Sequence, residues 1–487
     1  QKIIFGNNRK PQDQFNYRDL AEPVHDLDEE TYQFLAEACP EMMEHTHGEE
    51  GSLLPYFPGY KFENGKSTYR GEEVGEGGYV YAEPGMYGNV ALLDISSMHP
   101  HSAIAEVLFE VKFTKAFREI VEGRVSIKHE AWDIVNTMLD GKLTPYIQKV
   151  INGEMTSKQL ADALKTAINS VYGLTSASFD HPFRDNRNKD NIVANRGALF
   201  MVNLKHEVQR RGFIVAHIKT DSIKIPDATP EIIQFVMDYG KQYGYNFEHE
   251  ATYDRMCLVN DAVYIAKYKD GKHAGEWTAT GTQFQVPYVF KKLFSKEPIE
   301  FEDMCETKSV TSALYLDMNE GLPDVSELEK ELERIVKRAK EFGVTMDLSG
   351  NSGDAELDPL VKEIAKGHNY HFIGKVGQFC PIKPGCGGGI LLRETENKKT
   401  GEKGYAAATG SKGFRWLESE MVRELGKEND IDRTYYNNLV DEAVKSLSSY
   451  GDFERFVADE PFVSDNTPPW FGAGEPHEEE PTPFDVR

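Results

Sequence analysis

The stretch Lys165-Thr-Ala-Ile-Asn-Ser-Val-Tyr-Gly173 decides the fold of this 487-residue chain. Lys165, Asn169 and Tyr172 stand at positions i, i+4 and i+7, so on a helix their side chains share one face. A lysine and an asparagine on a helix usually belong to a solvated face, and that reading stands for the stretch taken alone. Its meaning comes from two further stretches, one on each side of it in the sequence.

Residues 89–95 (NVALLDI) form an apolar run of strand length with one aspartate, Asp94, near its end. Pro100 follows in a position suited to a first helical turn. Downstream, residues 213–225 (FIVAHIKTDSIKI) predict a β-hairpin whose turn is near Lys219 and Thr220. Taken singly, a strand-end aspartate is most often a cap, and an Asp-Ser pair in a hairpin is ordinary turn chemistry. Because the three stretches occur together in this order, we expect their polar residues to form one functional site.

The three stretches together resemble motifs A, B and C of the family B (alpha-like) DNA polymerases. Motif A has the pattern D-x-x-S-[LM]-Y-P, which is matched by Asp94, Ser97, Met98 and Pro100. Motif B has the pattern K-x-x-x-N-S-x-Y-G, which is matched by Lys165, Asn169, Ser170, Tyr172 and Gly173. Motif C has the pattern D-T-D-S, which is matched by Thr220, Asp221 and Ser222. The resemblance covers roughly residues 66–296, and motif B is its most specific part. Residues 260–268 (NDAVYIAKY) and 278–294 look most like tailed-bacteriophage members.

The resemblance implies an α+β fold with the right-hand polymerase architecture: a palm with an antiparallel sheet and helices, helical fingers, and a thumb, followed by a C-terminal α/β extension. We expect an N-terminal region and the first part of the palm over 1–110, fingers over 111–175, and the rest of the palm over 176–296. The thumb and extension would occupy 297–464, and 465–487 would be a disordered acidic tail.

Within 111–175 we expect two helices joined by a turn near residues 141–145, with a further helix over 192–211 ended by Gly212. A helix over 231–243 and strands at 263–268 and 276–280 complete the predicted palm. Ser326-Glu-Leu-Glu329 reads as a capping box that opens an amphipathic helix. Strands with long turns are expected over 371–410, and two helices over 413–449.

The resemblance also implies two-metal phosphoryl transfer, with Mg²⁺ as the metal and Mn²⁺ as an alternative. Oxygen ligands suit these ions, and two of them neutralise a transferring phosphoryl group. Asp94, Asp221 and the carbonyl of Ile95 are the expected ligands, and Lys165 is expected to act on the triphosphate. The expected nucleotide-binding residues are Ser97, Met98, His99, Asn169, Tyr172 and Arg118. The expected DNA-binding residues are Tyr264, Lys267 and Gly173.

Three positions depart from the family pattern. Lys219 replaces the first aspartate of D-T-D-S, His99 replaces the tyrosine that excludes ribonucleotides, and Ala262 replaces the lysine of a K-x-Y primer-gripping motif. We expect activity to survive Lys219 and expect Lys267 to substitute for the missing lysine. The alternative interpretation of Lys267 is that it is an exposed charge on an edge strand without a functional role.

The net charge of −25 argues against a nucleic-acid partner only if it is evenly spread. It is not, because residues 156–225 hold 11 basic and 6 acidic side chains. No apolar stretch is long enough to span a membrane, and no secretory signal pattern opens the chain, so we expect no membrane partner and a cytoplasmic location. Five scattered cysteines favour reduced thiols; zinc binding at Cys380 and Cys386 is the weaker alternative.

The sequence therefore predicts a DNA-directed DNA polymerase with primer-template DNA and dNTPs as partners, acting in phage genome replication. Only 93 residues precede Asp94, so we expect no 3′–5′ exonuclease in this chain and a separate polypeptide supplying one. The acidic tail would dock replisome proteins or serve solubility. The alternative function is a non-catalytic, polymerase-derived DNA-binding or scaffold subunit. A solely exonucleolytic enzyme would need a denser carboxylate cluster.

Overall fold

The computed structural model describes residues 27–44, 57–75, 77–175, 177, 179 and 192–464. The chain forms two compact units: one contains the residues up to Thr280 and those from Leu447 onward, and the other is Gly281–Ser446. No helix among the described residues is long and apolar enough to cross a membrane. The expected acidic tail, 465–487, lies outside the described residues.

The first unit is built on a seven-stranded, fully antiparallel sheet in the order β10-β9-β8-β5-β7-β6-β4. Its strands are β4 (Val80–Ala82), β5 (Gly85–Ile95), β6 (His217–Lys219), β7 (Ser222–Ile225), β8 (Phe247–Asn260), β9 (Val263–Tyr268) and β10 (Trp277–Thr280). The strands expected around Asp94, at the 213–225 hairpin, and at 263–268 and 276–280 are all present. An antiparallel sheet of this kind agrees with the α+β expectation.

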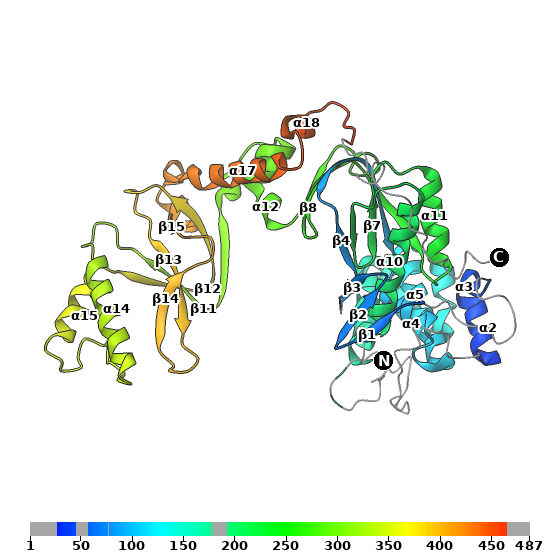
Figure 1. Ribbon diagram of the computed structural model, residues 1–487, viewed down its shortest axis with the longest axis horizontal. Coiled ribbons are helices and arrows are strands. Elements are labelled where there is room, and N and C mark those ends of the chain that lie inside the picture. The colour runs from blue at the N-terminus through cyan, green and yellow to red at the C-terminus, as the bar shows by residue number, and fades with distance from the viewer. Residues whose placement is uncertain are drawn as a thin grey trace. The chain divides into compact units, whose positions relative to one another are not determined.

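Helices α4 (Met98–Ala105), α10 (Ile192–Arg210) and α11 (Pro230–Lys241) pack with this sheet (Figure 1). α10 is buried almost all round, which suits a helix enclosed by its neighbours. Phe200 on α10 packs against Tyr239, Tyr243 and Tyr245. The helices expected over 192–211 and 231–243 are confirmed, and Gly212 follows α10 with a positive φ of 85°.

Before the sheet come α2 (Glu29–Ala38), α3 (Pro40–Glu44) and a small antiparallel sheet of β1 (Lys61–Glu63), β2 (Lys66–Tyr69) and β3 (Glu72–Val74). This small sheet is tied to α10. Tyr69 donates a 2.7 Å hydrogen bond to the Asn203 side chain, and the buried Lys205 ammonium is bonded to Glu72. The N-terminal region therefore packs on a helix of the main sheet.

The residues between α4 and α10 form a helical hairpin of α5 (Glu110–Lys128) and α8 (Ser157–Thr175). The expectation of a single turn near 141–145 is wrong, because α6 (Trp132–Val135), a 3-10 segment (Met138–Gly141) and α7 (Thr144–Ile151) lie between them. Pro145 starts α7 rather than closing a turn. Leu139 is buried, and its amide donates to Glu119 on α5, which anchors the connection.

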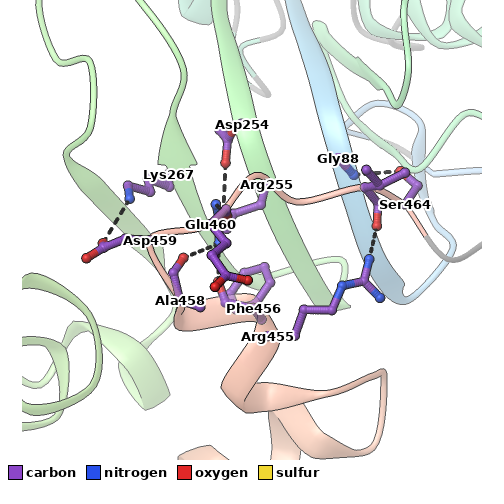
Figure 2. Close-up of polar contacts among 11 residues, drawn as sticks. Gly88, Asp254, Arg255, Lys267, Arg455, Phe456, Ala458, Asp459, Glu460 and Ser464 are labelled. Carbon is purple, nitrogen blue, oxygen red and sulfur yellow. Dashed lines mark hydrogen bonds and ion pairs between the residues drawn. The ribbon is translucent and has the colours of Figure 1, made fainter.

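The segment from Leu447 to Ser464, which the sequence grouped with 297–464, belongs to the first unit. It contains α18 (Phe453–Val457) and runs along β8 (Figure 2). The buried Arg255 guanidinium of β8 donates to the carbonyls of Phe456, Ala458 and Glu460 at 2.7–2.9 Å. At its end, Ser464 Oγ accepts from the amide of Gly88 at 2.6 Å. We call residues 447–464 the strap.

The second unit holds a five-stranded antiparallel sheet in the order β14-β13-β11-β12-β15. Its strands are β11 (Glu306–Asp317), β12 (Tyr370–Ile382), β13 (Ile390–Glu396), β14 (Lys403–Ala407) and β15 (Arg415–Glu418). Its helical elements are α12 (Thr282–Gln285), α13 (Pro287–Phe290), η2 (Lys291–Ser295), η3 (Phe301–Met304), α14 (Ser326–Glu341), α15 (Leu357–Ala365), α16 (Ser419–Glu424), η4 (Glu428–Asp430) and α17 (Arg433–Ser448), whose last two residues pass into the first unit.

Trp416, Phe379 and Tyr436 are completely buried in the core of the second unit. The strands expected over 371–410 and the later helices are confirmed, whereas β15 was not foreseen. The expected capping box at Ser326 is wrong. Val325 occupies the N-cap position without a side-chain bond, and the Ser326 amide donates instead to Asp324.

All five cysteines are free thiols. The Sγ atoms of Cys305 and Cys380 lie 3.5 Å apart, and the hydrogen bond with Cys305, together with burial, raises the pKa of Cys380 far above its usual value. Among the described residues, no group of three or more His, Cys, Asp or Glu side chains is arranged to hold a metal ion. Cys380 is buried and Cys386 is partly buried, and the reduced-thiol interpretation of the two residues stays a prediction.

Candidate active site

Asp94 and Asp221 come together because their strands are neighbours. Asp94 pairs with Ser222 across β5 and β7, and the amide of Ile95 donates a 2.8 Å hydrogen bond to the carbonyl of Asp221. On its other side Asp94 pairs with Glu248 of β8. The carboxylates of motifs A and C thus lie at the same end of two adjacent strands, where backbone pairing holds them in register.

The turn between β6 and β7 places Asp221. Thr220 adopts a left-handed conformation (φ 57°), and its amide donates to the Tyr79 carbonyl at 2.9 Å. Gly78 leaves room for this turn, because a Cβ on it would lie 2.9 Å from the Thr220 side chain. Lys219, which replaces an aspartate in the family pattern, is exposed on edge-proximal β6.

The site carries more negative than positive charge. The pKa of Asp94 is raised to about 7 by burial and by the negative charges of Asp221, Glu250 and Glu248, and Lys224 opposes this shift. Burial also raises the pKa of Asp221, while its own backbone amide, His99 and Lys224 lower it. Two crowded carboxylates with raised pKa values form a donor set that suits a hard divalent cation bound together with substrate phosphates.

Lys224 is a site residue that the sequence did not single out. It is buried on β7 opposite Leu92, two positions from Asp94 along β5. Burial lowers its pKa to about 8, opposed by Glu250 and Asp94. Its ammonium group lies 3.0 Å from His217 Nδ1 and 4.7 Å from the centre of the Tyr264 ring. The sequence signal that could have identified Lys224 is its position two residues after Ser222, which places it on the same face of the strand as the residue that pairs with Asp94.

Tyr264 and Lys267 lie on opposite faces of β9, because three positions separate them on a strand. Tyr264 faces Lys224, whereas Lys267 lies over Trp277 and pairs with Asp459 of the strap at 3.9 Å (Figure 2). The structure therefore does not bring Lys267 to Tyr264. The cation beside Tyr264 is Lys224, which comes from the motif C hairpin.

Motifs A and B meet through their rings. His99 on α4 stacks on Tyr172 on α8, with centroids 5.5 Å apart and planes 9° from parallel. Burial lowers the pKa of His99, so the ring is neutral near pH 7. This contact joins the helical hairpin to the start of α4, the helix that follows Asp94. Lys165, Asn169 and Gly173 are exposed on α8.

The start of α4 is held by both its neighbours. Ser97 takes a left-handed conformation (φ 56°) at the N-cap, and its Oγ accepts from Arg124 of α5 at 3.5 Å. Met98 is buried and packs against Gly197 of α10, where a Cβ would lie 2.7 Å from its methyl carbon. Met98 therefore offers the site its backbone and not its side chain.

Arg118, expected to bind nucleotide, pairs with Glu122 at 2.8 Å. Both residues line a small polar cavity of about 50 Å³ with His101 of α4 and Cys39 of α2–α3. Arg124, six residues further along α5, is the arginine that reaches Ser97. The helix carries five basic residues, and the sequence analysis selected Arg118 from among them.

Comparisons with known proteins identify no relative by sequence. No family model matches the chain, and no curated protein matches it. Among solved structures, the chain is similar to the family B DNA polymerase from the hyperthermophilic archaeon Pyrobaculum calidifontis, with 14% sequence identity and a TM-score of 0.36. The match covers 84% of this chain and 50% of that one, so the chain spans about half the length of that neighbour.

Proposed function

We propose that the chain is a template-directed DNA polymerase that adds dNTPs to a primer 3′ end. The observation that carries the proposal is the convergence of three distant motifs. Asp94 and Asp221 sit on adjacent strands, and His99, which follows Asp94, stacks on Tyr172 of the Lys165–Tyr172 helix face. The tailed-phage likeness of residues 260–268 and 278–294 suggests phage genome replication as its setting.

Asp94, Asp221 and the carbonyl of Ile95 would hold the two divalent ions. When bound, the ions supply charge neutralisation for the triphosphate and lower the pKa of the primer hydroxyl. The raised pKa values of the two aspartates support this assignment, because each carboxylate lacks sufficient compensating charge from the protein. Lys224, on the same face of the sheet as Asp94, provides part of that compensation.

The chain's own residues bind and orient the substrates. The exposed Lys165 ammonium on α8 supplies a cation for the triphosphate and a proton for the leaving pyrophosphate. Backbone amides at the start of α4, at Ser97 and Met98, suit phosphate oxygens. The His99–Tyr172 stack presents a flat surface for the incoming nucleotide. Asn169 and Gly173, exposed on the same helix, face the nascent base pair and the template.

Primer extension with Mg²⁺ and dNTPs tests this function. We expect extension by the natural chain and a loss of at least about 100-fold in Asp221→Asn, because one metal-ligating carboxylate is removed. Asp270→Asn, which neutralises an exposed aspartate after β9, is the matched control and should extend normally. DNA binding without extension by the natural chain would instead support the non-catalytic subunit.

A further inference from the structure

The second unit exposes a group of aromatic rings on one face of its sheet. Tyr370 and Phe372 come from β12, Tyr405 from β14 and Tyr315 from β11, and His368 lies just before β12. Phe372 is 68% exposed, Tyr405 45% and Tyr370 41%. We call these five residues the aromatic platform. Large rings with this exposure on strands of one sheet form a surface patch that the core does not explain.

The platform faces away from the core because of strand alternation. Leu314 and Leu316 of β11 are buried in the core, so Tyr315 between them points to the opposite face. Phe372 is the direct cross-strand partner of Tyr315. The register of the sheet therefore gathers these rings on its outer face.

The rings are ordered among themselves. His368 stacks on Tyr370 (5.2 Å, 12°) and Tyr370 stacks on Tyr405 (4.6 Å, 18°). Tyr315 meets Phe372 and Tyr405 edge to face at 5.5 and 5.1 Å. His368 is itself fixed, because its two ring nitrogens bond to Asp317 and Glu329 at 2.6 Å each. The platform is therefore arranged before any ligand arrives.

The segment 370–415, which contains Tyr370, Phe372 and Tyr405 of the platform, is basic. Residues 370–415 contain eight Lys or Arg and three Glu, a net charge of +5 in a chain of −25. β12 and β14 contain Lys375 and Lys403 and no carboxylate, whereas β11, which carries Tyr315, contains Lys308, Glu306 and Asp317. Lys403 is on the platform face, two positions from Tyr405, and pairs with Glu394 at 2.9 Å. Aromatic rings among lysines are the combination that binds unpaired nucleotides, with bases on the rings and phosphates near the cations.

We propose that the aromatic platform binds single-stranded nucleic acid by stacking unpaired bases. A duplex offers backbone and groove edges but keeps its base faces inside, so it has no surface that matches exposed rings. The net positive charge favours a polyanion over an apolar protein partner. This site is separate from Asp94 and Asp221 and does not depend on the polymerase function proposed above.

Fluorescence anisotropy with the full chain and a short labelled oligothymidylate, without Mg²⁺ or dNTPs, tests the proposal. We expect Phe372→Ala and Tyr405→Ala each to weaken binding by about fivefold or more. Tyr405→Phe keeps the ring and should bind normally. Phe342→Ala, at the end of α14 and 75% exposed, is the matched control and should leave affinity unchanged.

Photocrosslinking with 5-iododeoxyuridine in the same oligonucleotide locates the contact. Crosslinks at Tyr370, Phe372 or Tyr405 are expected, and crosslinks confined to other residues would overturn the proposal. Unchanged affinity in both alanine variants would do the same. The proposal would also be overturned if the alanine variants lost as much affinity for a blunt duplex of the same length, because the surface would then be a general DNA contact. Extension of a primer whose 3′ end is fully paired to a longer template should continue in these variants, which separates this proposal from the polymerase function.

Discussion

The amide of Ile95 donates a 2.8 Å hydrogen bond to the carbonyl of Asp221. This bond between main-chain atoms joins the strand of motif A to the turn of motif C. The positions of the two carboxylates are therefore determined by β-sheet register and not by side-chain interactions. Substituting either aspartate should remove its charge while leaving the backbone of the site in place.

Asp94→Asn should stabilise the metal-free chain while it abolishes extension. The substitution removes a carboxylate that is crowded by Asp221, Glu250 and Glu248. After discounting for partial exposure, we expect a gain of about 1 kcal/mol, or a rise of about 2–4 °C in Tm. Differential scanning calorimetry in EDTA measures it. Mg²⁺ should raise the Tm of the natural chain more than that of the variant; a lower Tm in the variant would contradict the repulsion.

His99→Ala should weaken the choice of dNTP over rNTP. The ring of His99 stacks on Tyr172, and its loss opens space at the nucleotide face of α8. We expect rNTP incorporation relative to dNTP to rise by about tenfold, since a lost steric contact typically changes discrimination by 1–3 kcal/mol. Single-nucleotide insertion kinetics measure the ratio. His99→Tyr keeps a stacking ring and should retain discrimination; equal ratios in all three proteins would exclude a role for this stack.

Arg255→Met should release the strap. The substitution leaves the carbonyls of Phe456, Ala458 and Glu460 without their donor, at a cost of about 3 kcal/mol. Limited proteolysis should then cut within 447–464 before the remainder of the first unit. Lys267→Met is the control, because its ion pair is long and Asp459 is fully exposed, and it should cost less than about 1 kcal/mol. Similar protease resistance in both variants would argue against Arg255 as the anchor.

The stability of the second unit should fall as the pH rises through the His368 titration. Burial lowers the pKa of His368, but hydrogen bonds and charge from Asp317 and Glu329 outweigh it, so its folded-state pKa is raised. Its stabilisation is complete below the unfolded pKa of about 6.5 and is lost as pH passes the higher folded value. Hydrogen exchange at Asn369 and Tyr370 reports the change. His368→Gln should remove this pH dependence; an unchanged profile would assign it elsewhere.

Much of the first unit follows from local sequence. The apolar run ending at Asp94, the hairpin at Asp221 and the helix that contains Lys165 all appear where pattern and turn chemistry predicted them. The connection between α5 and α8 was misread because Leu139 and Asp140 take positive φ values, supported by burial of Leu139 and its bond to Glu119. Such support comes from contacts across a helix pair, which no local pattern reports.

The sequence by itself determined which residue types were available for chemistry: two aspartates at strand ends, and Lys165, Asn169 and Tyr172 on one helix face. Only the tertiary structure decided which cation joins them. Lys224 reaches Tyr264, whereas Lys267 turns to the strap, because alternate residues of a strand face opposite sides of its sheet. Likewise, Arg124 rather than Arg118 reaches Ser97. Periodicity assigns a residue to a face, but the packed neighbours determine what that face contacts.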